Sequence, residues 1–178
     1  TNMKIESKLV KDIIEDKNIV AVTLTGSEPA GRSVASIAGQ NLKKTVMELG
    51  GSDAYIILDD ADLEQATDLA TFGRLQNNGQ TCIAAKRFVI LDIIYDEFLV
   101  LFTKKMKAAK IGKPTDEDTY YGPMARRDLR DELHEQVLKT IAQGGRLVLG
   151  GEIPHGKGAY YPATILADLE PGMEGFDN

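Results

Sequence analysis

The sequence predicts an α/β fold in which helices and strands alternate along the chain. Two β-branched or apolar runs, 18–26 and 45–49, enclose a helical stretch rich in small residues, and a similar alternation begins again at Ala54. This rhythm is typical of a doubly wound sheet with parallel strands. The pair Gly50–Gly51 separates the two alternations, so it is the candidate domain boundary.

Before the glycine pair we expect two helices and two strands. Apolar residues at spacings of three and four, from Ile5 to Ile14, make the first helix amphipathic. The β-branched run that ends at Gly26 is typical of a buried strand. Ser27 or Glu28 is a candidate cap for the second helix. The elements expected here are a helix over 3–16, a strand over 18–26, a helix over 30–40 and a strand over 45–49.

After the glycine pair the alternation continues to the end of the chain. The acidic run 59–62 supplies a cap and favourable charges to a long helix, and Gly144–Gly145 ends the last one. A polar break at 77–82 precedes a strand, and Phe98 and Phe102 lie on one side of the helix that follows it. We expect a strand over 54–58, a helix over 63–76, a strand over 87–91, helices over 95–109 and 125–143, and strands over 147–149 and 160–166.

Composition and charge exclude several classes of protein. The chain has 178 residues, 43% of them apolar, with 21 Lys and Arg against 27 Asp and Glu, as in an ordinary globular chain. This acidic balance argues against nucleic acid as a partner, because phosphate binding needs clustered Lys and Arg. One cysteine makes no internal disulfide, and no apolar run is long enough for a transmembrane helix. We expect a cytoplasmic protein that binds neither nucleic acid nor a membrane.

Cys82 is the only thiol and the first candidate for chemistry. It follows five residues, 77–81, that are polar or lack a side chain and are poorly suited to a core. The glycine among them lets backbone approach a ligand, and N–H groups beside the sulfur are suited to hold an oxyanion. The alternative, which is common for a lone cysteine, is a small buried hydrophobe.

Glu48 is the second candidate, because it interrupts an apolar strand and precedes two glycines. A carboxylate at the end of a strand, where the ligand crevices of α/β sheets lie, is suited to act as a general base. The alternative is a strand-end glutamate that points into water. The strand-to-helix turn Thr25-Gly26-Ser27 is suited to receive a phosphate or a nicotinamide ring, although neither standard phosphate-binding fingerprint is present.

The sequence predicts no metal site. His134 lies in a charged helical stretch and His155 in a glycine-rich loop, and neither has a partner at ligand spacing. We expect surface positions for both histidines. The acidic runs 59–62 and 116–118 are expected to be solvated turns and helix-start charges.

Three short motifs, taken in order, resemble those of the NAD(P)-dependent aldehyde dehydrogenases. They are VTLTGS at 22–27, MELGGSD at 47–53 and QNNGQTC at 76–82, and the glutamate and cysteine stand 34 positions apart, the interval that this family shows. AAKRFVI, GPMARRDLRDELHEQV, LVLGGE and YYPATIL extend the resemblance through the chain. ELGGSD, together with GPMARRDLRDELH, is similar to the corresponding segments of a branch of bacterial succinate-semialdehyde dehydrogenases.

By this resemblance, Cys82 matches the catalytic nucleophile, which forms a thiohemiacetal and then a thioester, and its backbone N–H matches half of the oxyanion hole. Glu48 matches the general base that activates the hydrolytic water. The implied cofactor is NAD or NADP. The cofactor-binding residues that the resemblance implies are Thr25, Gly26, Ser27, Leu49 and Gly50.

The resemblance also implies a substrate and an assembly. The substrate is a small aldehyde such as succinate semialdehyde, and the parent protein is expected to be a homodimer or homotetramer. Gln76 stands where some succinate-semialdehyde enzymes have an arginine for the distal carboxylate, which leaves Arg74, or an arginine outside this piece, as a candidate substitute.

The resemblance divides the chain into the C-terminal part of a Rossmann-type dinucleotide-binding domain, 1–49, and a truncated catalytic domain, 50–178. The family's asparagine oxyanion donor and adenine-ribose groups belong upstream of Thr1, and its nicotinamide-ribose glutamate belongs after Asn178. We therefore expect a piece of a longer protein, with little or no dehydrogenase activity by itself.

Two other functions stay open at this point. A cysteine hydrolase that needs no nicotinamide would place the imidazole of His134 or His155 within hydrogen-bond reach of the sulfur of Cys82. A non-catalytic structural piece would bury Cys82 and leave it inert.

Overall fold

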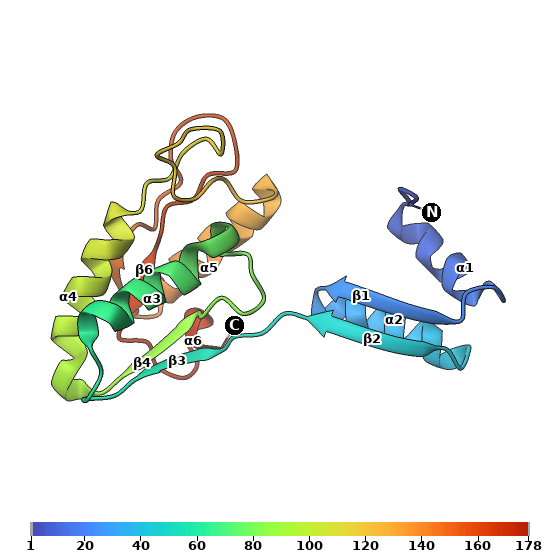
Figure 1. The fold of residues 1–178 in the computed structure, drawn as a ribbon, viewed down its shortest axis with the longest axis horizontal. Helices are drawn as coiled ribbons and strands as arrows, with labels where there is room; N and C mark the ends of the chain where they lie inside the picture. The colour runs from blue at the N-terminus through green and yellow to red at the C-terminus, as the bar shows by residue number, and fades with distance from the viewer. Residues whose placement is uncertain (1, 178) are drawn as a thin grey trace. The chain divides into compact units, whose positions relative to one another are not determined.

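Two pairs of parallel strands organise the chain, one in each of two units (Figure 1). The computed structural model describes residues 2–177; the first unit ends at Gly51 and the second begins at Ser52. Within residues 2–177, no helix has both the length and the apolar composition needed to cross a membrane.

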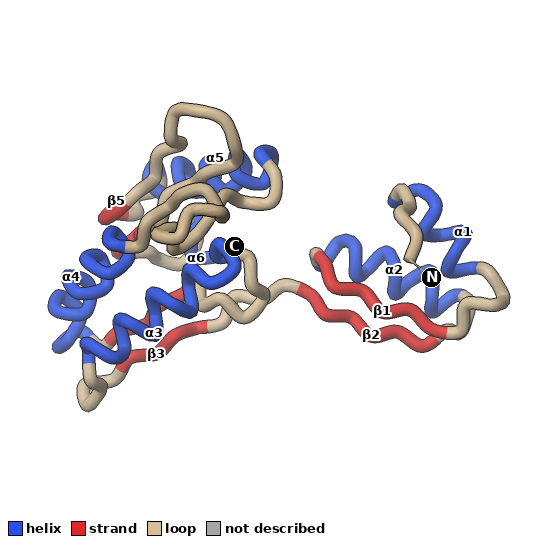
Figure 2. The backbone as a smooth tube through the Cα atoms, turned by 45° about the horizontal axis from the view of Figure 1, so that its top comes forward, coloured by secondary structure: helices blue, strands red, loops and turns tan. Residues whose placement is uncertain are grey.

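The first unit is a β-α-β arrangement with one further helix. Its strands lie side by side, and α2 forms the crossover between them (Figure 2). Buried side chains of α1 and α2 make a small core against one face of the sheet. The elements are the 3-10 helix η1 (Ser7–Leu9), α1 (Val10–Glu15), β1 (Ala21–Gly26), α2 (Glu28–Gln40) and β2 (Lys44–Leu49).

Two expectations for the first unit are wrong in extent. The helix predicted over 3–16 is confined to α1 and the short η1 before it. The strand predicted to be buried is exposed along one face: Val22 and Leu24 are half-buried, whereas Ala21, Thr23 and Thr25 are exposed. The physical reason is that the helices of this unit cover one face of the two-stranded sheet.

The second unit repeats the parallel crossover and adds an antiparallel pair. β3 and β4 pair with Ala54 opposite Arg87, and α3 joins them; β5 and β6 run antiparallel. The elements are β3 (Ala54–Ile57), α3 (Leu63–Leu75), the 3-10 helix η2 (Gln76–Gly79), β4 (Arg87–Ile90), α4 (Asp92–Ala108), α5 (Arg127–Ala142), β5 (Arg146–Leu149), β6 (Ile165–Ala167) and α6 (Glu174–Asp177).

The main core lies where α4 packs on α3 and on the inner face of the β3–β4 sheet. Phe98 and Phe102 are buried on one side of α4, as the sequence predicts, and they belong to one buried cluster with Met106, Ala70 and Ile57. The rings of Phe98 and Phe102 lie 5.5 Å apart between centroids, a spacing typical of packed aromatic pairs. This core holds α3, and with it the start of the loop that carries Cys82.

The last predicted strand is mostly wrong. Of the residues 160–166, only Ile165 and Leu166 belong to β6, which continues to Ala167. Pro162 has no N–H for a strand ladder, and the N–H of Ala163 donates instead to the hydroxyl of Tyr121, at 2.7 Å. The segment is therefore tied to a distant loop rather than to a sheet.

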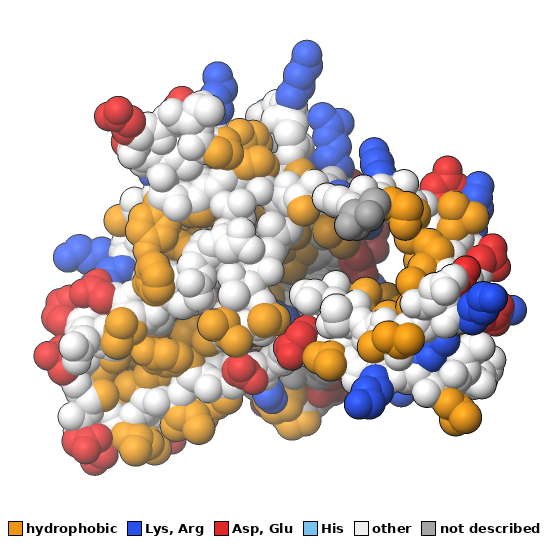
Figure 3. Space-filling view, turned by 45° about the vertical axis from the view of Figure 1, so that its right-hand side comes forward, with side chains coloured by type: hydrophobic (Ala, Val, Ile, Leu, Met, Phe, Trp, Pro, Cys, Tyr) orange, Lys and Arg blue, Asp and Glu red, His pale blue; other side chains and the backbone are white. Residues whose placement is uncertain are grey.

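Hydrophobic side chains gather in patches on the surface (Figure 3). Ile56 of β3 and Val89 of β4 are exposed, as are Leu58 and Leu91, which directly follow the two strands. Parallel sheets normally bury both faces, so the sheet face that carries Ile56 and Val89 departs from the usual pattern.

Replacing Asp62 with Ala should destabilise the second unit by about 1 kcal/mol, because the Asp62 carboxylate caps α3. Its Oδ1 accepts a hydrogen bond from the N–H of Gln65 at 3.1 Å. Urea denaturation followed by circular dichroism would measure the free energy of unfolding. Asp60→Ala, an exposed change in the same acidic run, is the control and should have little effect. Equal losses for both variants would contradict the capping role.

Candidate active site

The predicted site residues of the first unit gather at one end of its sheet. The parallel register places Thr25 opposite Glu48 and Gly26 opposite Leu49, at the carboxyl ends of both strands. The chain then turns at Ser27 into α2. Ligand crevices of parallel sheets lie beyond this end, so strand pairing brings the candidate base and the candidate phosphate turn to one edge.

The turn into α2 leaves polar groups exposed. Ser27, one of the two candidate caps, stands at the N-cap position, but its hydroxyl makes no capping hydrogen bond. Thr25, Gly26 and Ser27 are all exposed. A helix start without a side-chain cap keeps N–H groups and the positive end of the helix dipole available to an anion. This donor set suits a phosphate of a dinucleotide.

Leu49 packs closely against α2. A Cβ atom on Gly31 would lie 2.7 Å from Cδ2 of Leu49, so a larger residue there would push the end of β2 away from the helix. Glu48 and Gly50, on either side of Leu49, are exposed. The small residues of α2 thus set the position of the strand end that carries the candidate base.

Cys82 is exposed in the loop between η2 and β4. The interpretation of Cys82 as a small buried hydrophobe is therefore wrong. The residues that enter the core are Ala84 and Ala85, two and three positions later. An exposed thiol on a polar loop is accessible to an electrophile.

Three consecutive residues before Cys82 have left-handed backbone conformations. Asn77 has φ 49°, Asn78 has φ 57° and Gly79 has φ 72°. Such conformations suit glycine and are costly for other residues, about 1 kcal/mol or more each. They persist where surrounding contacts hold them, so the partners of this turn decide its shape.

Two side chains of the turn hydrogen bond to a distant loop. The amide of Asn78 accepts from the N–H of Gly122 and donates to the carbonyl of Pro123, the latter at 3.2 Å. Oε1 of Gln80 accepts from the N–H of Ala125 at 3.1 Å. Sequence reasoning missed these contacts, because their partners lie more than 40 positions away and no local pattern links them.

Arg74, in the last turn of α3, contacts the loop that carries Cys82. Its guanidinium donates to the carbonyls of Gly79, Ala84 and Ala85. Burial lowers the pKa of Arg74 from its usual value, because the charged form loses solvation. The expectation that Arg74 is a candidate partner for a substrate carboxylate is not supported, since its guanidinium is directed at backbone oxygens.

The histidines do not support a cysteine hydrolase. Nδ1 of His134 lies 3.0 Å from the hydroxyl of Tyr161, and His134 is half-buried rather than at the surface as predicted. His155 is exposed in its loop, as predicted. A catalytic imidazole would need hydrogen-bond reach of the sulfur of Cys82, but the hydrogen-bond partner of His134 is a tyrosine.

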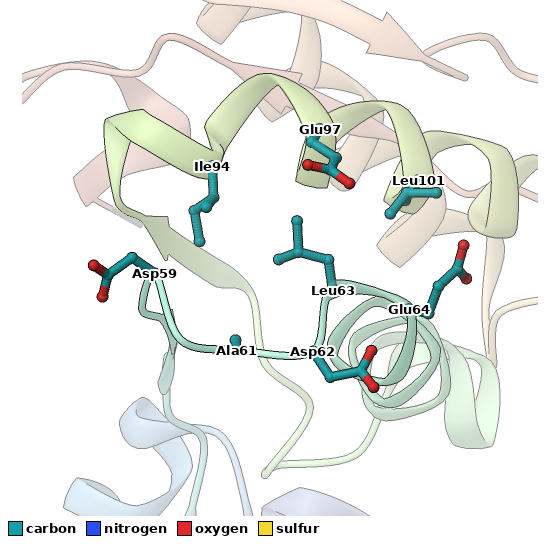
Figure 4. A pocket seen from close by; sticks show the side chains of 8 residues that line it. All are labelled: Asp59, Ala61, Asp62, Leu63, Glu64, Ile94, Glu97 and Leu101. Atoms are coloured by element: carbon teal, nitrogen blue, oxygen red, sulfur yellow. The ribbon is translucent and has the colours of Figure 1, made fainter.

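The acidic run before α3 borders a pocket of about 430 Å³ between α3 and α4. Leu63 and Ile94 contribute apolar side chains to it (Figure 4). Asp62 is occupied as the helix cap, and Glu64 pairs with Lys105 at 2.9 Å. In the described part of the chain, no group of three or more His, Cys, Asp or Glu is arranged to hold a metal ion.

Comparisons with known proteins agree with the resemblance that the sequence motifs indicate. A model of the aldehyde dehydrogenase family matches residues 3–178. A succinate semialdehyde dehydrogenase of Escherichia coli K12, named for NAD(P)+, is 54% identical over 94% of this chain and 36% of its own length. A succinate-semialdehyde dehydrogenase of Mycobacterium avium, named for NADP+, is 48% identical over 95% of this chain and 36% of its own length.

Solved structures agree with the sequence matches. Succinic semialdehyde dehydrogenase from Streptococcus pyogenes, in complex with NADP+, matches with a TM-score of 0.93 and 43% identity over 97% of this chain and 38% of that one. This chain thus spans just over a third of the length of these relatives. The predicted aldehyde-dehydrogenase-like α/β fold is confirmed. The chain belongs to the aldehyde dehydrogenase family.

Proposed function

We propose that this chain is part of an NAD(P)-dependent enzyme that oxidises succinate semialdehyde, or a similar small aldehyde, to the carboxylic acid. The observation that carries the proposal is the exposed thiol of Cys82 on a loop held by hydrogen bonds. The names of the relatives reported above support the substrate and the cofactor. A cysteine hydrolase is less well supported, because His134 is paired with Tyr161.

In this proposal the first unit binds the cofactor and the second carries the catalytic cysteine. The exposed turn Thr25-Gly26-Ser27 and the uncapped start of α2 fit a dinucleotide phosphate, with Leu49 and Gly50 beside the nicotinamide. We therefore assign 1–49 to the end of a dinucleotide-binding domain and 50–178 to a catalytic domain.

In the proposed reaction, Cys82 acts first. Its thiolate attacks the aldehyde carbon, a C–S bond forms, and the carbonyl oxygen becomes an oxyanion that the backbone N–H of Cys82 stabilises. A bound nicotinamide dinucleotide supplies the hydride acceptor. As the oxyanion collapses, the carbon loses its hydride and a thioester remains on the sulfur of Cys82.

Glu48 acts in the second half of the reaction. Its carboxylate takes a proton from water, and the resulting hydroxide attacks the thioester carbon. The C–S bond then breaks, which releases the acid and restores the thiolate of Cys82, and the carboxyl group of Glu48 gives its proton back to solvent. The exposed position of Glu48 at the carboxyl end of β2 leaves its carboxylate open to water.

Replacing Cys82 with Ser in the full-length enzyme should lower kcat for aldehyde oxidation by at least about a thousandfold, because a serine hydroxyl without an activating base is a weak nucleophile. Steady-state production of reduced nicotinamide would measure it. Ser7→Thr, a conservative change at an exposed residue of η1, is the control. Unchanged turnover in the Cys82 variant would remove the residue from its proposed role.

Replacing Glu48 with Gln should slow hydrolysis of the thioester by about a hundredfold or more, while the first hydride transfer is kept. Stopped-flow absorbance would then show a burst of reduced nicotinamide followed by a slow steady state. Glu15→Gln, at an exposed glutamate of α1, is the matched control and should behave as the wild type. Loss of the burst itself would indicate that Glu48 acts before the thioester forms.

The 178-residue chain by itself should react with iodoacetamide at one thiol but produce little reduced nicotinamide with NADP+ and succinate semialdehyde. Cys82 is exposed, whereas the chain spans just over a third of the length of the relatives it matches, so we expect turnover to need the rest of the enzyme. Mass spectrometry would measure alkylation of the folded chain, and absorbance would measure turnover. Complete protection of the thiol would favour an inert structural piece, and robust turnover would contradict the expected dependence on the rest of the enzyme.

A further inference from the structure

Arg74 joins the two flanks of the segment that carries Cys82. Its guanidinium donates to the carbonyl of Gly79, three positions before the cysteine. The same group donates to the carbonyls of Ala84 and Ala85, at 3.4 and 3.1 Å, which follow the cysteine. One planar cation therefore connects backbone on both sides of the thiol.

The part of this loop that precedes Cys82 lines a cavity. A cavity of about 530 Å³ lies in the second unit, and Arg74, Asn78, Gly79 and Gln80 contribute to its lining. Close packing normally holds buried backbone in one position, and a cavity supplies no such contacts. The position of residues 78–80, which line the cavity, therefore depends strongly on hydrogen bonds, whereas the side chains of Ala84 and Ala85 are buried.

The other contacts hold mainly the first flank. Asn78 and Gln80 tie that flank to the loop around Gly122. The second flank bonds to the first through the N–H of Ala84, which donates to the carbonyl of Thr81 at 3.0 Å. Arg74 adds the bonds that fix Ala84 and Ala85 to α3, an element of the main core.

The strained turn fits the guanidinium closely. Gly79 has φ 72°, and a Cβ atom there would lie 2.9 Å from Nη2 of Arg74 and 3.2 Å from its carbonyl oxygen. Glycine thus allows both the left-handed backbone and the close approach of the cation. A lysine ammonium is a point charge on a flexible stem, so it does not reproduce a planar fork that spans several carbonyls.

We propose that Arg74 is a positioning residue, whose guanidinium fixes Gly79 and Ala84–Ala85 so that the sulfur and backbone N–H of Cys82 keep one geometry toward the aldehyde. This inference rests on the proposed function for its catalytic consequence. Its structural content, a loop immobilised by Arg74, is measurable without any activity.

Hydrogen exchange followed by mass spectrometry tests the structural content in the 178-residue chain. In Arg74→Met, amides of peptides covering 77–86 should exchange at least about tenfold faster, because hydrogen bonds from a charged donor are lost. Arg74→Lys should give an intermediate increase, and peptides of α5 should be unchanged in both variants. Arg126→Met is the control, because Arg126 is exposed and its guanidinium bonds to Asp128 on the surface.

Kinetics of the full-length enzyme test the catalytic consequence. Arg74→Lys should lower kcat about tenfold or more and leave KM for the dinucleotide unchanged, since geometry at the thiol affects the chemical step. If Arg74 instead bound the substrate carboxylate, Arg74→Lys would raise KM for succinate semialdehyde and leave KM for an uncharged aldehyde unchanged. That result would overturn the proposal.

The outcomes separate this inference from the proposed function. Wild-type exchange over 77–86 in Arg74→Lys, or a uniform increase in all peptides, overturns the inference whatever the activity. Should Arg74→Met fail to fold, the lysine variant alone decides between these results. An active Cys82→Ser enzyme overturns the proposed function and leaves the exchange result for Arg74 intact.

Discussion

Parallel strand pairing is the constraint on which both units depend. Two parallel strands cannot be joined by a tight turn, so each pair needs a crossover, which α2 forms in the first unit and α3 begins in the second. The same pairing aligns the carboxyl ends of neighbouring strands, which is why Thr25 and Glu48 stand opposite each other. The backbone ladder thus brings candidate cofactor and base residues together before any side chain contributes.

The cysteine loop is held in a different way. It leads from η2 into the start of β4, where no strand ladder extends, and it borders a cavity. Side chains that hydrogen bond to backbone therefore replace ladder contacts and add to the burial of Ala84 and Ala85: Arg74 bonds from α3, and Asn78 bonds to the loop at Gly122. Left-handed residues in the turn carry a conformational cost that these bonds offset. The thiol of Cys82 is thus exposed on a loop whose backbone is held by hydrogen bonds.

Much of the fold could be predicted because its signals are local. The apolar stripe of α4 and the cap at Asp62 depend on neighbours within one or two turns, and both occur as expected. The strand over 160–166 failed for the opposite reason. Pro162 interrupts it, and Ala163 bonds to the hydroxyl of Tyr121, a partner 42 positions away. The first helix is shorter than predicted and β1 is exposed on one face. Both belong to a unit whose buried core consists of a few side chains on one side of its sheet.

The sequence by itself determined the family and the candidates, Cys82, Glu48 and the turn at Gly26, because the order and spacing of motifs are properties of the linear chain. Only the tertiary structure decided that Cys82 is exposed and that Arg74 points at backbone carbonyls. Those facts depend on which distant segments meet, as Asn78 meets the Gly122 loop 44 positions away. Such long-range contacts follow from the packing of the whole unit, and no local sequence pattern encodes them.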